Sequence, residues 1–218
     1  MRRDRVEGFI PVAAAFLAFA FWDSLVLYPL KIFVVLLHEI SHGLAAILTG
    51  GSIVSIHLSA DQGGVCLTRG GSRFLILSAG YLGSLFFGSL LVLVAARSRR
   101  DRVVVALLGF ALVAVTLLFV RTLFGFAYGL VAGAALLLAA RKLPEPVSDA
   151  ILKVLGAVSC LYAVWDIASD ILLRDVPGSD ASALARLTGI PATLWGLLWA
   201  GVALLVTGVT FWKAVRVR

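Results

Sequence analysis

The chain has 218 residues, of which 61% are hydrophobic and 14% are charged, and its mean hydropathy is +1.04. Soluble domains are about 45–50% apolar and about 25% charged, so this composition excludes a soluble globular protein and indicates an integral membrane protein. The net charge of +7 does not indicate a nucleic-acid partner. The basic residues instead form short clusters between apolar runs, which is typical of anchoring at lipid headgroups.

Six or seven stretches are apolar enough to cross a membrane, which takes about 20 residues each. They predict an all-α, polytopic helical bundle with a short β-hairpin, folded as a single domain over residues 1–218. The first stretch is short for a span, and only Arg121-Thr122 divides the fourth from the fifth. In chain order the stretches cover about 9–22, 29–50, 74–96, 103–120, 123–140, 150–173 and 192–212.

Basic residues are nearly balanced between the two sides of a seven-span arrangement, so they leave the membrane orientation open. We expect a multi-pass protein of a bacterial cytoplasmic membrane. The two cysteines, Cys66 and Cys160, predict neither a disulfide nor a paired cysteine metal motif.

The second stretch, about 29–50, contains the sequence His38-Glu39-Ile40-Ser41-His42. Two histidines four residues apart lie on one face of a helix, so their imidazoles can bind one metal ion. Glu39 can then reach a water on that metal as a general base. Ionisable residues inside a membrane span cost about 2.5–3.5 kcal/mol each, which favours a functional site. The alternative is a polar cluster satisfied between helices.

Residues 52–73 have a different pattern, since polar and apolar residues alternate from Ser52 to Ser59 with the period of a strand. Turn residues follow at 61–64, and 65–68 can form the returning strand. An open strand edge beside the metal helix could bind an extended peptide, with Gly63, Gly64 and Val65 as candidate contacts. An ordinary surface hairpin is the alternative, and in either case His57 is expected to be a strand residue.

A catalytic zinc usually has three protein ligands, and the stretch at about 150–173 supplies two candidates for the third, Asp166 and Asp170. Counting residues from the helix ends places Asp166 at the membrane depth of His42 and Asp170 nearer the headgroups. The count therefore favours Asp166 as the ligand and Asp170 as a supporting group or alternative ligand. Asp180 is expected to be the N-cap of a short helix over 181–187.

Small residues open the third span in Gly80-Tyr81-Leu82-Gly83-Ser84 and predict close packing against the metal helix. With the HExxH sequence, the hairpin and the late aspartates, this pattern resembles the site-2 protease (M50) family of intramembrane zinc metallopeptidases. It resembles most the compact M50B-like branch, over about residues 30–200. The family motif Gly-Pro-x-x-Asn corresponds here to residues 80–84, where Ser84 replaces the asparagine. Gly80 and Ser84 are candidate substrate-binding residues. The chain has neither the Asp-Gly pair of better-studied members nor a PDZ-like insert.

The resemblance implies one Zn²⁺ per chain, bound by His38, His42 and Asp166, with Glu39 as the catalytic base. The predicted function is a zinc-dependent endopeptidase that cuts membrane-spanning proteins or peptides within the lipid bilayer. Two alternatives are an inactive membrane scaffold or regulator that keeps the fold, and a metal or small-solute transporter. The oligomeric state and the substrate are left open.

Overall fold

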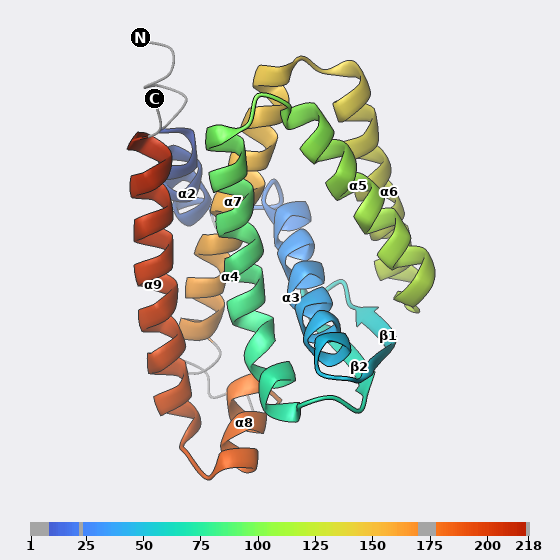
Figure 1. Cartoon of the computed structure of the whole chain (residues 1–218), viewed down its shortest axis with the longest axis vertical. Coiled ribbons are helices and arrows are strands. Elements are labelled where there is room, and N and C mark those ends of the chain that lie inside the picture. The colour runs from blue at the N-terminus through green and yellow to red at the C-terminus, as the bar shows by residue number, and fades with distance from the viewer. Residues whose placement is uncertain (1–8, 22–23, 170–177, 217–218) are drawn as a thin grey trace.

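A computed structural model describes residues 9–21, 24–169 and 178–216 (Figure 1). The element labels are those of Figure 1 and begin at α2. The elements are α2 (Ile10–Ala20), α3 (Tyr28–Leu48), β1 (Ser52–Leu58), β2 (Gly64–Arg69), α4 (Arg73–Arg97), α5 (Asp101–Phe119), α6 (Leu123–Lys142), α7 (Glu145–Ile167), α8 (Asp180–Thr188) and α9 (Ala192–Arg216).

Within the described residues, six helices are long and apolar enough to cross a membrane: α3, α4, α5, α6, α7 and α9. Helix α2 has 11 residues and falls short of a span, so the first apolar stretch is the one that left the count at six or seven. The predicted polytopic helical bundle with a β-hairpin is confirmed.

Helix α3 lies at the centre of the bundle and is packed by α4, α7 and both strands (Figure 1). Apolar residues surround its first turns, and six consecutive side chains from Ile32 to Leu37 are buried. Helices α4 and α7 cross closely, because a Cβ on Gly88 would lie 2.8 Å from the Gly156 carbonyl oxygen and one on Gly156 would lie 2.6 Å from that of Gly88. This crossing fixes α4, and with it one wall of the site, against the bundle.

The antiparallel hairpin β1–β2 folds back along α3 rather than projecting from the bundle. The Tyr28 hydroxyl, in the first turn of α3, donates a hydrogen bond of 2.7 Å to the Ala60 carbonyl at the hairpin turn. The strands therefore run beside α3 at membrane depth. There the unpaired backbone groups of a strand edge need protein, or a polar cavity, to satisfy them.

The connection between α5 and α6 covers the outer edge of β1. Arg121 donates its backbone N–H to the Ile56 carbonyl at 3.0 Å, and Ile56 and Val120 form a parallel bridge. The Thr122 hydroxyl accepts from the Leu58 N–H at 3.1 Å and donates to the Leu58 carbonyl at 2.8 Å. The edge of β2 is the one that remains available for another strand.

Candidate metal centre

Three side chains converge near the end of α3 that lies beside α8. Asp180 Oδ2 lies 3.1 Å from His38 Nε2 and 3.2 Å from His42 Nε2. One ligand atom from each of the three lies within 4.8 Å of the others, and among the described residues this is the group that fits a metal ion. Tetrahedral zinc with bonds of about 2.0–2.1 Å places neighbouring ligand atoms roughly 3.3 Å apart. The two distances from Asp180 match that requirement, and the two histidine nitrogens lie within 4.8 Å of each other.

The hydrogen-bond roles of these atoms also favour a cation between them. His42 Nδ1 lies 2.7 Å from the Ile76 carbonyl oxygen, which can only accept, so Nδ1 carries the proton. In the neutral ring, the Nε2 lone pair then faces Asp180, as it does in metal-binding histidines with a carbonyl partner. Asp180 Oδ2 is buried and, among the described residues, has no hydrogen-bond partner of adequate geometry. A metal ion at this point satisfies all three atoms.

The start of helix α8 places the Asp180 side chain beside His38 and His42. Ser179 is the N-cap of α8, and its hydroxyl accepts a hydrogen bond from the Ser182 N–H at 3.3 Å. The expectation that Asp180 is the N-cap is wrong, because Asp180 is the first residue of the helix and its side chain points into the site.

The structure does not place Asp166 where the residue count put it. Asp166 lines the same cavity and is near enough to His38 to interact with it electrostatically, but it is not in the group of converging ligand atoms. Helix α7 ends at Ile167, so Asp166 lies in its last turn. Asp180, rather than the predicted Asp166, therefore converges with the two histidines, while Asp170 lies outside the described residues.

Glycine at position 80 makes room for this cluster. A Cβ on Gly80 would overlap His38 Nε2 and would lie 2.6 Å from Asp180 Oδ2. Gly83 similarly faces Ser41 of α3, so the predicted close packing of the third span on the metal helix is present. Ser84, a predicted substrate contact, does not line the cavity described below: it is 1% exposed, and its hydroxyl donates to the Gly80 and Tyr81 carbonyls at 3.1 Å each.

A cavity of about 820 Å³ joins the three converging side chains to the hairpin. Glu39 is 4% exposed and lines this cavity. A Cβ on Gly64 would lie 2.5 Å from Glu39 Oε1, so β2 passes directly beside the carboxylate. Gly63, Gly64 and Val65, the predicted substrate contacts on the hairpin, all line the cavity.

The register of the hairpin shows which backbone groups of β2 face outward. Ser59 donates its N–H to the Gly63 carbonyl at 2.9 Å, so the backbone groups of Gly63 point toward β1. Because these directions alternate along a strand, those of Gly64, Cys66 and Thr68 point to the open edge.

The hairpin carries two further polar residues, His57 and Cys66, and only Cys66 lines the cavity. His57 Nε2 lies 2.9 Å from the Ser55 hydroxyl, and His57 is not among the cavity-lining residues, as expected of a strand residue. Cys66 lines the cavity, where burial, with a smaller contribution from the Glu39 charge, raises the pKa of its thiol to about 12. Its thiol is therefore protonated at neutral pH.

Comparison with family models matches residues 11–210 of the chain to the family described as Peptidase M50B-like. Comparison with curated proteins and with solved structures found no match. The family match spans far more than half of the chain and includes α3, the hairpin, α4 and α8. A chain with six candidate membrane spans and two histidines and an aspartate converging on one point therefore belongs to the Peptidase M50B-like family of membrane metallopeptidases.

Proposed function

We propose that the protein is a zinc-dependent intramembrane endopeptidase whose metal ligands are His38, His42 and Asp180 and whose general base is Glu39. The observation that carries the proposal is the convergence of these three ligand atoms in a cavity that also contains Glu39 and the open edge of β2. Three protein ligands leave a fourth tetrahedral position for water, which is the arrangement of catalytic zinc sites.

When bound, zinc supplies Lewis acidity that lowers the pKa of a water ligand toward about 7 and polarises a carbonyl group. Glu39 would accept a proton from the water that attacks the peptide carbonyl carbon and would later deliver it to the amine nitrogen as the C–N bond breaks. The Ile76 carbonyl orients the His42 ring, and Gly64 of β2 lies against the Glu39 carboxylate.

The substrate binds to the site as an extended strand in this proposal. A peptide bond inside a membrane helix is shielded by the helix hydrogen bonds, so the segment to be cut must unwind and have its backbone groups satisfied again. The outward backbone groups of Gly64, Cys66 and Thr68 can pair with such a segment and hold it beside Glu39. The α5–α6 connection occupies the other edge of the hairpin, so pairing is directed to the cavity side.

The two alternative functions are less well supported by the same residues. A scaffold without catalysis has no physical need for a carboxylate buried beside a metal site, because Glu39 costs free energy there and ligates nothing. Among the described residues one His/Asp group fits a metal ion, whereas a transport pathway needs successive sites across the membrane.

The test is hydrolysis of a model transmembrane substrate by the purified protein in proteoliposomes, with zinc counted by mass spectrometry. Glu39→Gln is expected to keep one zinc per chain and to lose 10²–10⁴-fold or more of its activity, as general bases do. His57→Gln removes a histidine outside the cavity and should leave both readouts unchanged. Full activity in Glu39→Gln, or no zinc in the wild type, would overturn the proposal.

A further inference from the structure

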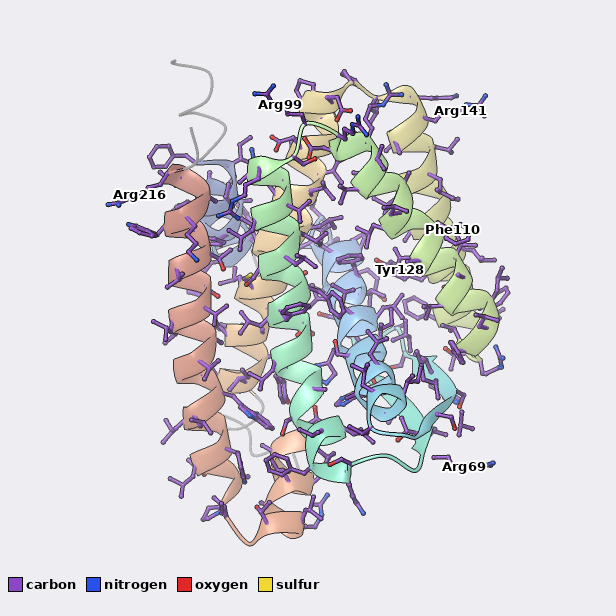
Figure 2. The ribbon with its side chains drawn as sticks, in the orientation of Figure 1. Arg69, Arg99, Phe110, Tyr128, Arg141 and Arg216 are labelled. Atoms are coloured by element: carbon purple, nitrogen blue, oxygen red, sulfur yellow. The ribbon has the colours of Figure 1, made fainter. Side chains whose placement is uncertain are left out.

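A second cavity lies between α5 and α6, at the end of the bundle that carries Arg99, Arg141 and Arg216 (Figure 2). It has a volume of about 630 Å³ and is a groove with mostly apolar walls and two arginines at one end. The residues that line it are Arg102, Val103, Ala106, Leu107, Phe110, Leu137, Ala140, Arg141 and Glu145.

The length of the groove matches one leaflet of a bilayer. Along α5 it extends from Arg102 past Ala106 to Phe110, which at 1.5 Å per residue is about 12 Å. Half of the hydrocarbon core is about 15 Å thick. Figure 2 shows Phe110 partway along α5 and Arg141 at the end of α6, so the apolar part faces the bilayer interior and the charged part lies at the headgroup level.

Hydrogen bonds hold the charged end of the groove in place. The Arg102 guanidinium donates to the carbonyls of Ala140 and Arg141 at 2.8 and 2.7 Å. The Glu145 carboxylate accepts from the Arg102 backbone N–H at 3.0 Å, so hydrogen bonding directs this acidic group to the start of α5. The charged residues that line this end are Arg102, Arg141 and Glu145, so its net charge is positive.

We propose that this groove binds an anionic phospholipid, with the phosphate between Arg102 and Arg141 and one acyl chain along Ala106 and Phe110. The charge of the opening selects the headgroup, because a zwitterionic lipid places a second cation among arginines that already repel it. Basic pockets between membrane helices select anionic headgroups for the same reason. The site is separate from the metal centre, since none of its lining residues lines the larger cavity.

Native mass spectrometry of the full-length protein in detergent, titrated with phosphatidylglycerol or phosphatidylcholine, tests the proposal. Phosphatidylglycerol should bind at least about fivefold more tightly, the factor that corresponds to one basic residue near a membrane surface. Arg141→Gln should reduce phosphatidylglycerol affinity about fivefold, whereas Arg99→Gln removes the same charge outside the groove and should have little effect. Ala106→Trp fills the apolar part and should weaken binding while Arg102 and Arg141 remain.

Retained zinc content serves as the check that each variant is folded, and it does not depend on peptidase activity. Equal affinity for the two lipids would refute an anionic site. Equal losses in Arg99→Gln and Arg141→Gln would show diffuse attraction to surface charge and would also refute it. Unchanged binding in Ala106→Trp would refute the acyl-chain position, since the headgroup alone would then account for the affinity.

Discussion

The choice between Asp180 and Asp166 as the third ligand gives the sharpest test of the proposed site. Four-ligand zinc sites bind with about 10–16 kcal/mol, so one ligand contributes roughly 3 kcal/mol. Asp180→Ala removes one of three protein ligands and should weaken zinc binding about a hundredfold or more. Asp166→Ala removes a nearby charge and no ligand, so its zinc affinity should fall less than tenfold.

Competition with a chromophoric chelator measures both affinities in the same preparation, and size-exclusion chromatography confirms that both variants remain folded. The structure places the Asp180 oxygen 3.1 and 3.2 Å from the two histidine nitrogens, and it shows no corresponding position for Asp166. If Asp166→Ala empties the site while Asp180→Ala retains zinc, the geometric assignment is wrong and the residue count from the helix ends was the better guide.

Three further outcomes are expected. Gly80→Ala should lose zinc and activity because its Cβ would overlap His38 Nε2, whereas Gly201→Ala, with no atom within 4 Å of the added carbon, should behave as wild type in zinc analysis. Thr68→Pro should lower the cleavage rate at least tenfold with zinc retained, because proline removes an outward backbone N–H that Thr68→Ala keeps. Equal cleavage rates in these two variants would show that the β2 edge does not bind substrate. Cys66, with a thiol pKa raised to about 12 by burial and by Glu39, should react with maleimide at pH 8 at least about a hundredfold more slowly than a free cysteine, and Glu39→Gln should accelerate the reaction.

Local patterns in the sequence predicted the elements that the structure contains. The positions of the spans follow from apolar runs of sufficient length, and the hairpin follows from the alternation between Ser52 and Ser59. His38 and His42 share a helix face because they are four residues apart, which requires no knowledge of the tertiary fold. Glycine at 80 was recognised as a packing residue, but its contact with the metal cluster needed the position of α8.

The third ligand could not be located by the same means. The residue count treated two spans as straight rods of equal depth and assumed that the ligand lies on a span. Asp180 instead begins α8, a short helix between α7 and α9, and reaches α3 through the tertiary fold. The predicted cap at Asp180 gave the helix start correctly to within one residue. Nothing local indicated that the start points at His38.

The proposed ligand set joins two distant parts of the chain, which would affect when the protein becomes active. His38 and His42 enter the membrane early in synthesis, while Asp180 and α9, which packs against α8, arrive after all the other described helices. Domains fold as the chain emerges, at about 5–20 residues per second, so the histidine pair exists for several seconds without its carboxylate. A nascent chain therefore carries a metal-binding helix that cannot yet hold a complete catalytic site. With the proposed ligands, proteolytic competence would coincide with completion of the bundle and would spare neighbouring membrane proteins from a partly folded peptidase.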